Sequence, residues 1–214
     1  MNKLLPAALN LRNPSLISPN DILKANIMKY IHYIIGLLIF CCSQNWAMAQ
    51  TEQKAVAPIK TIASLDVARY QGTWYEIAKF PNWFQRKCIA DTNATYKIKE
   101  DGNVSVTNRC TFENNEKGEA LGTARQIGDS TSPKLEVRFA PAWLGFLPLV
   151  WGDYWVIDID PEYQLAAVSD PRREYLWILS RTKSVDQSRY QALLSRLVNE
   201  NGFSLEKLSL TPQN

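Results

Sequence analysis

A succession of short strand-like runs separated by turn residues is the feature of this sequence that most restricts its fold. Apolar and polar side chains alternate clearly in the run that places Ala94, Tyr96 and Ile98 on one face. The dipeptide Asp101-Gly102 is a strong hairpin signal. Eight runs are expected in all, over residues 73–80, 92–99, 104–112, 119–127, 135–139, 154–159, 164–169 and 175–181. This pattern predicts an all-β protein, either an antiparallel sandwich or an eight-stranded antiparallel up-and-down barrel.

One amphipathic helix is expected after the strands, over residues 185–199. Ser184 or Asp186 can cap its start, and Gly202 ends it. The tail, residues 205–210, is expected to return as a final strand. We expect this single C-terminal helix to pack outside the sheet through one apolar stripe, made of Tyr190, Leu193, Leu194, Leu197 and Val198.

The N-terminal segment has the pattern of a signal peptide. Residues 30–42 form an apolar run of about 13 residues, which is short for a membrane span, and Lys29 precedes the run. Ala47-Met48-Ala49 supplies a cleavage pattern, so the mature protein is expected to be exported and to begin at Gln50. Residues 1–27 are interpreted as an upstream extension from a misassigned start codon, and an uncleaved membrane anchor is the alternative.

Two cysteines at the end of the apolar run raise the question of lipidation. A lipidated cysteine follows a small residue in bacterial lipoproteins, whereas Phe40 precedes Cys41 and Cys41 precedes Cys42. We therefore expect a soluble exported protein, with lipidation at Cys41 or Cys42 as the alternative. The chain is divided into an extension and signal peptide over residues 1–49, a flexible leader over 50–63 and one folded domain over 64–210.

Charge and histidine content exclude several classes of function. Residues 1–49 carry four of the 24 basic side chains and one of the 21 acidic ones, which leaves 20 of each in residues 50–214. Without a basic stripe, no nucleic-acid partner is expected. The single histidine, His32, lies in the apolar segment, which excludes histidine-based catalysis and histidine-ligated zinc from the domain. No metal site, no cofactor and no catalytic residue is predicted.

Cys88 and Cys110 are the remaining two thiols of the expected mature chain. In an oxidising compartment an even pair of cysteines favours a disulfide bond, which would stabilise the fold by roughly 3 kcal/mol in the chain-entropy model. Two unpaired buried thiols are the alternative.

Three short motifs, in order along the chain, resemble those of the lipocalin family. Gly72-Thr73-Trp74 matches the G-x-W motif at the first strand. Residues 160–163, with Asp160 and Tyr163, are similar to the family's T-D-Y turn, although Asp160 replaces the threonine. Arg181 matches the arginine that lies across the tryptophan of the first motif. The sequence around these motifs is similar to that of the bacterial outer-membrane branch of the family, which includes apolipoprotein D-like members.

The resemblance implies a closed barrel, over nearly all of the mature chain, that carries a small hydrophobic ligand. A fatty acid or lysophospholipid is the expected ligand, within cell-envelope lipid maintenance. The expected location is the periplasm, with contact to the outer membrane surface. Trp74 and Arg181 would close one end of the barrel by packing ring against guanidinium.

A barrel of eight strands can enclose one small ligand, and alternate residues of its strands face inward. A solid core filled by the same side chains is the alternative. The residues expected to line an apolar cavity are Phe80, Trp83, Tyr96, Val137, Phe139, Tyr154 and Trp177.

Two apolar connections are expected at the open end, over residues 81–91 and 141–152. An exposed apolar run of this size marks a contact surface for a membrane, a partner or a ligand. A second copy of the chain, and a loop folded over its own pocket, are the alternatives. The contact residues are predicted to be Trp143, Leu144, Phe146, Leu147 and Trp151.

Glu76 falls on the same face as Trp74 if the first strand is regular. A carboxylate inside an apolar barrel needs a partner, and Arg125 or a buried water is expected to supply it. Glu76 is therefore interpreted as a structural acid, with a contact to the ligand headgroup as the alternative. The rival hypothesis is a lipid-modifying enzyme or isomerase on the same scaffold, with Glu76, Tyr96 or Tyr154 as acid–base groups.

Overall fold

The structure is a computed structural model that describes residues 57–214. The expected signal peptide, its cleavage site, His32, Cys41 and Cys42 lie outside the described residues. Within residues 57–214, no helix is both long and apolar enough to cross a membrane.

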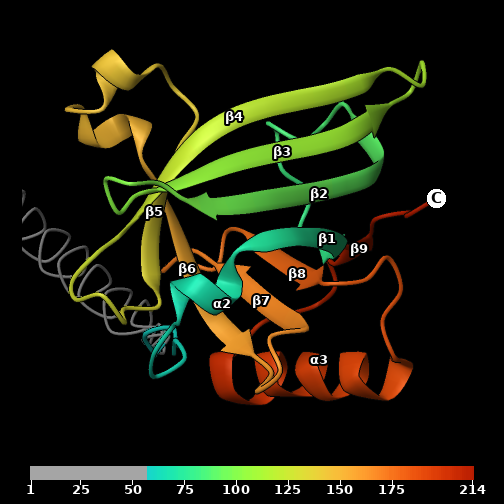
Figure 1. Cartoon of the computed structure of the whole chain (residues 1–214). Helices are drawn as coiled ribbons and strands as arrows, with labels where there is room; N and C mark the ends of the chain where they lie inside the picture. Colours follow the sequence, from blue (N-terminus) through green and yellow to red (C-terminus); the bar gives the residue numbers. More distant parts are fainter. Residues whose placement is uncertain (1–56) are drawn as a thin grey trace, which may run out of the picture. The chain divides into compact units, whose positions relative to one another are not determined.

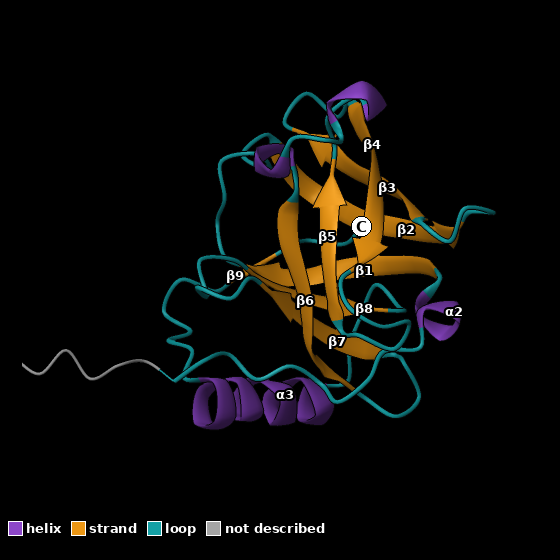
Figure 2. Cartoon of the chain, turned by 90° about the vertical axis from the view of Figure 1, so that its left-hand side faces the viewer, coloured by secondary structure: helices purple, strands orange, loops and turns teal. Residues whose placement is uncertain are grey.

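Eight antiparallel strands form the closed barrel that the sequence predicted, with one longer helix outside it (Figure 1). Each strand pairs with its neighbour in sequence, and β1 closes the barrel by pairing with both β2 and β8. Figures 1 and 2 both show helix α3 (Gln187–Asn201) lying along the outside of the barrel beside β7. The strands are β1 (Gly72–Lys79), β2 (Cys88–Ile98), β3 (Val104–Phe112), β4 (Lys117–Gln126), β5 (Lys134–Arg138), β6 (Gly152–Ile159), β7 (Leu165–Ser169) and β8 (Leu176–Ser180).

Two hydrophobic clusters lie on opposite faces of the same barrel wall. The residues of β7 are all buried because Ala166 and Val168 face the barrel interior while Leu165 and Ala167 face the cluster under α3. This two-sided burial explains why the sequence of β7 is almost continuously apolar. The interior cluster surrounds the candidate site, whereas the outer cluster attaches the helix.

Helix α3 is close to its expected bounds and has the expected end, since Gly202 adopts φ +67° at its C-cap. Asp186 rather than Ser184 caps its start, accepting a hydrogen bond from the backbone N–H of Arg189 at 3.0 Å. The buried stripe of α3 differs from the predicted one in two residues: Val198 is exposed, and the polar Asn201 is buried in the last turn. The tail returns as the short strand β9 (Ser209–Leu210), which pairs with β1.

The structure differs from the expected flexible leader at its described end, residues 57–63. Ile59 is buried in the cluster under α3, and the backbone N–H of Ile62 donates to the carbonyl of Val156 at 3.3 Å. The short helix α2 (Val67–Tyr70), which the sequence analysis missed, follows. Four residues show too little periodicity to predict, but Asp66 caps them by accepting from two backbone N–H groups.

The disulfide bond between Cys88 and Cys110 is present and joins β2 to β3. The β2–β3 hairpin turns at Gly102, where φ is +80°, as the Asp101-Gly102 signal predicted. Strand β2 begins four residues earlier than expected because the bulges between Cys88 and Asn93 hide its alternation.

Candidate ligand-binding site

The barrel encloses a cavity of about 960 Å³. Residues from every strand of the barrel except β7 line it, together with α2 and the loops at one end. Most of the wall is apolar or aromatic, and pockets of this size accommodate drug-sized apolar ligands. The inner wall includes Leu65, Ala94, Val104, Val106, Ala124, Leu135, Val137 and Leu179.

Six of the seven residues expected in the cavity do line it, namely Trp83, Tyr96, Val137, Phe139, Tyr154 and Trp177. Phe80 does not. The pairing of β1 with β8 shifts register between Glu76 and Ala78, so the residues after the shift face the opposite side of the wall. Phe80 consequently packs against Phe203 in the cluster under α3, with the ring centroids 6.1 Å apart.

The Glu76 carboxylate faces the cavity and is only 2% exposed. Its partners are the Lys79 ammonium at 2.9 Å, the Thr211 hydroxyl at 2.6 Å and the Gln85 amide at 2.7 Å. The expectation of Arg125 as partner is wrong, because Arg125 points outward and pairs with Glu136 at 2.9 Å. The Arg125 side chain lies on the exposed face of β4 and cannot reach through the barrel wall. The donors that lie next to Glu76 in space come from the C-terminal tail, through Thr211, and from the loop after β1, through Gln85.

Gln85 connects Glu76 to the cavity wall. While its amide nitrogen donates to Glu76, its carbonyl oxygen accepts from the Trp177 indole at 3.0 Å. Asn82 donates to the same oxygen at 2.7 Å. The orientation of the Trp177 ring in the cavity therefore depends on a buried acid that the ring does not touch.

Three tyrosine hydroxyls meet at the closed end of the cavity. The Tyr154 hydroxyl lies 2.9 Å from that of Tyr70 and 2.8 Å from that of Tyr96. We call Tyr70, Tyr96 and Tyr154 the tyrosine triad. Burial raises the pKa of Tyr96 to about 12, and it also raises the pKa values of Tyr70 and Tyr154. All three phenols are therefore uncharged hydrogen-bonding groups at neutral pH.

Trp74 and Arg181 close this end as expected. The Trp74 side chain is fully buried, stacks on Tyr70 and donates its indole N–H to the Tyr70 carbonyl at 2.9 Å. The Arg181 guanidinium lies 4.0 Å from the Trp74 ring centroid and donates to the carbonyls of Arg69 and Thr73. This contact seals the barrel and fixes α2 across its end.

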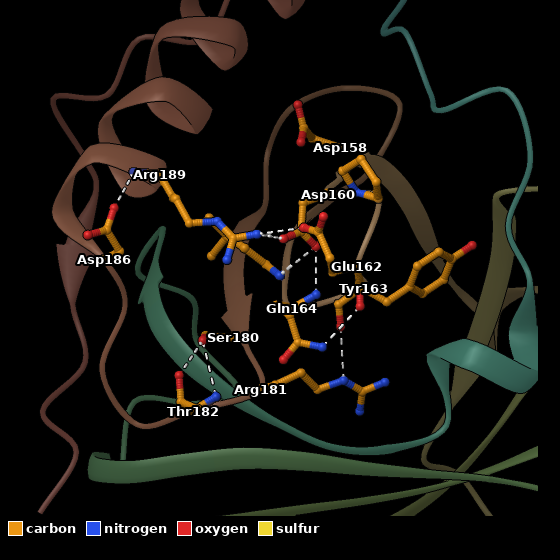
Figure 3. A network of polar contacts seen from close by, with 12 residues as sticks. Asp158, Asp160, Glu162, Tyr163, Gln164, Ser180, Arg181, Thr182, Asp186 and Arg189 are labelled. Atoms are coloured by element: carbon orange, nitrogen blue, oxygen red, sulfur yellow. Dashed lines mark hydrogen bonds and ion pairs between the residues drawn. The ribbon is translucent and has the colours of Figure 1, made fainter.

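The turn that resembles the T-D-Y motif attaches the helix to the closed end (Figure 3). Asp160 accepts hydrogen bonds from the backbone N–H groups of Gln164 and Leu165, and it also pairs with Arg189 of α3. Figure 3 shows Arg189 reaching Glu162 as well, at 2.9 Å. The motif residues are therefore structural and lie away from the cavity wall.

Exposed apolar side chains surround the other end of the barrel. Trp143, Phe146 and Leu149 are 72%, 76% and 83% exposed, on a loop that contains two short 3₁₀ helices, Ala142–Leu144 and Pro148–Val150. Of the other residues predicted for this surface, Leu144, Leu147 and Trp151 are half-buried. Leu149 and Phe84 are exposed residues that the prediction did not single out.

Trp151 has a structural role instead of forming part of the exposed surface. Its ring centroid lies 4.1 Å from the Arg125 guanidinium and 5.0 Å from the Arg138 guanidinium, and its N–H donates to the Gly145 carbonyl at 2.8 Å. Arg138 donates to the carbonyl of Ala142 at 2.8 Å. These contacts fix the loop and leave its tip exposed.

Two polar side chains on the cavity wall were missed by sequence reasoning. The Thr92 hydroxyl and the Asn108 side-chain oxygen are buried and have no hydrogen-bond partner among the described residues. The alternation of β2 and β3 could have indicated that they face inward. Within residues 57–214, no group of three or more metal-ligating side chains lies close enough to bind a metal ion.

Comparison with known proteins agrees with this architecture. A family model described as a lipocalin-like domain matches residues 65–213. The temperature-induced lipocalin-1 of Arabidopsis thaliana is 44% identical over 165 residues, which cover 76% of this chain and 86% of the plant protein. The outer membrane lipoprotein Blc of Citrobacter freundii is 36% identical over 174 residues, which cover 81% of this chain and 89% of that relative.

A more distant relative and a solved structure extend the comparison. Mouse apolipoprotein D is 27% identical over 194 residues, which cover 87% of this chain and 95% of the mouse protein. The structure of insecticyanin from the tobacco hornworm Manduca sexta matches with a TM-score of 0.56 at 20% identity, over 72% of this chain and 83% of that one, and supports the fold alone. With its closed barrel, its outer helix and the family model over most of its length, this chain belongs to the lipocalin family.

Proposed function

We propose that this lipocalin binds one single-chain lipid, a fatty acid or a lysophospholipid, and releases it unchanged. The cavity of about 960 Å³ with a mainly apolar wall is the observation that carries the proposal. Lipocalins with similar sequences make small hydrophobic ligands the natural class for this cavity. Reversible burial requires no bond to be made or broken, so the protein acts as a carrier or a store.

The size of the hydrophobic effect favours an acyl chain. Each buried CH₂ group contributes about 0.8 kcal/mol, so ten methylene groups contribute roughly 8 kcal/mol before the costs of association. A chain that runs along Val104, Val106 and Leu135 would meet apolar side chains for most of its length. Micromolar or tighter affinity for long chains is therefore expected.

Two cationic side chains at the opening support an anionic headgroup. Arg86 and Lys87 line the cavity entrance, are exposed, and form no ion pair with a carboxylate of the described residues. Both stand in the loop that also contains Trp83 and Phe84. A carboxylate or phosphate at this end would meet cations while its acyl chain lies inside the barrel.

We also propose that the protein is exported to the periplasm and works on envelope lipids at the outer membrane. Relatives from three bacterial species bear the name outer membrane lipoprotein, and the signal-like N-terminus supports export. The exposed tips Trp143, Phe146 and Leu149 would touch the lipid surface, since aromatic rings suit the membrane–water interface. A homodimer through the same loop stays a separate prediction.

Two measurements test the ligand class. Native mass spectrometry of the protein purified from its own cells should find one unmodified lipid per barrel. Calorimetric titration with fatty acids and lysophospholipids should show affinity rising about fourfold for each added CH₂ until the cavity is filled. Affinity without any dependence on chain length would contradict the proposal, and recovery of a chemically altered lipid would favour the rival enzyme.

A further inference from the structure

The tyrosine triad forms a polar floor in a mainly apolar cavity. Tyr70 and Tyr96 are buried, Tyr154 is half-buried, and all three line the cavity. The triad marks the closed end because Tyr70 stacks on Trp74 and Tyr96 is paired with Gly72 at the start of β1. An acyl chain that fills the barrel must end against these hydroxyls.

A count of protons shows that the triad is incomplete. Each phenol has one O–H donor and can also accept. The two contacts, Tyr70 with Tyr154 and Tyr154 with Tyr96, use two of the three protons. No other group of the described residues forms a hydrogen bond with any of the three hydroxyls. Whichever way the hydroxyls rotate, one donor remains available to something inside the cavity.

The nature of the ligand decides whether this donor is satisfied. Water can satisfy it in the empty cavity, but an apolar chain end would displace the water and leave a buried O–H unpaired, which is unfavourable. An oxygen atom on the chain end would accept the proton. The same burial that raises the pKa values of the phenols disfavours negative charge at this place, so the oxygen must be uncharged.

We propose that the floor of the cavity binds an uncharged oxygen, a hydroxyl or a carbonyl, on the end of the lipid that enters first. The inference rests on the proposed function and narrows it. The preferred ligand is then an amphiphile with polar groups at both ends. Its ionised end lies at the opening near Arg86 and Lys87, and its oxygenated end lies at the triad.

Matched lipids and matched variants test this inference. The probes are unsubstituted fatty acids and their ω-hydroxy counterparts, compared at each chain length by calorimetry. In the wild-type protein, the ω-hydroxy acid should bind at least as tightly as the plain acid at the length that reaches the floor. In the triple variant Tyr70→Phe/Tyr96→Phe/Tyr154→Phe, the plain acid should bind more tightly and the ω-hydroxy acid about tenfold more weakly than the plain acid.

Tyr190→Phe is the control, since Tyr190 is a buried tyrosine of α3 that does not line the cavity. It should preserve the wild-type ratio of affinities. Circular dichroism checks that the triple variant folds. If it does not fold, tyrosine labelled with ¹³C at Cζ reports on the wild-type hydroxyls directly, and the two probes should shift the triad signals differently.

The possible results separate the two proposals. If the triple variant keeps the wild-type preference, or if both probes shift the labelled signals equally, the oxygen binds elsewhere, for example beside Thr92 and Asn108, and the inference is wrong. In that case binding of plain acids would still support the proposed function. Failure of the wild-type protein to bind either probe would overturn both.

Discussion

Removal of the Glu76 side chain should destabilise the protein more than the loss of any surface ion pair would. In Glu76→Ala, the Lys79 ammonium loses its partner at 2.9 Å while its side chain is only 13% exposed. The donors of Thr211 and Gln85 lose their acceptor as well. Breaking a buried ion pair by removing one partner costs about 3–5 kcal/mol. Because Lys79 retains some contact with solvent, we expect the free energy of unfolding to fall by about 3 kcal/mol.

The same substitution should also weaken ligand binding. Gln85 orients the Trp177 indole through a hydrogen bond of 3.0 Å, and Gln85 is itself oriented by Glu76. The conservative variant Glu76→Gln keeps the volume and can still accept from Thr211. Its amide NH₂ faces the Gln85 NH₂, so it should lose less stability than Glu76→Ala but show a similar loss of affinity.

Urea unfolding followed by circular dichroism measures the loss of stability. Glu174→Ala is the matched control, because it removes an exposed pair with Arg172 at 3.0 Å and should change the free energy of unfolding by less than about 1 kcal/mol. Equal losses in Glu76→Ala and Glu174→Ala would refute the argument that burial makes the Glu76 contacts strong.

Three further predictions follow from the cavity and its closed end. Val137→Trp should fill the cavity from its wall and abolish calorimetric binding of long fatty acids while the circular dichroism spectrum remains unchanged; undiminished binding by the folded variant would contradict the cavity assignment. Trp74→Ala removes a fully buried indole and should lower the free energy of unfolding by about 3–5 kcal/mol in urea titrations, and a loss below about 1 kcal/mol would contradict its role as the seal. Because burial raises the pKa of Tyr96 to about 12, against about 10 for a free phenol, the unfolded state ionises first, so stability should be complete below pH ~10 and decline as the pH rises towards 12. Ultraviolet titration checks this, since the phenols of the tyrosine triad should ionise only as the protein unfolds, and their ionisation near pH 10 in the native state would contradict it.

Most of the barrel could be predicted because its determinants are local. The alternation of Ala94, Tyr96 and Ile98 with polar residues predicts which face of the strand points inward, and Asp101-Gly102 predicts the hairpin turn that follows. The three motifs then distinguish a barrel from a sandwich. Five of the six correctly predicted cavity residues belong to expected strands and follow from this alternation, whereas Trp83 follows from its place in the loop at the open end.

The wrong predictions concern residues whose positions depend on contacts with segments distant in the sequence. Phe80 was expected to line the cavity, but the register shift after Glu76 places it on the outer face of the barrel wall. Such a bulge is favoured by the pairing with β8 and leaves no trace in the alternation of β1 itself. For Glu76, one of the three partners is Thr211, which lies 135 residues away and could not be chosen from composition.

The sequence by itself determined the strand periodicity, the C-terminal helix with its caps, the cysteine pair and the closure by Trp74 and Arg181, because each depends on neighbours along the chain or on a short motif. Only the tertiary structure decided which polar groups meet inside the barrel. Tyr70, Tyr96 and Tyr154 come from three separate elements, and their hydroxyls converge because the closed sheet brings those elements to one end. The physical reason is that hydrogen-bond distances of about 3 Å depend on closure of the whole barrel, whereas alternation requires only the backbone of one strand.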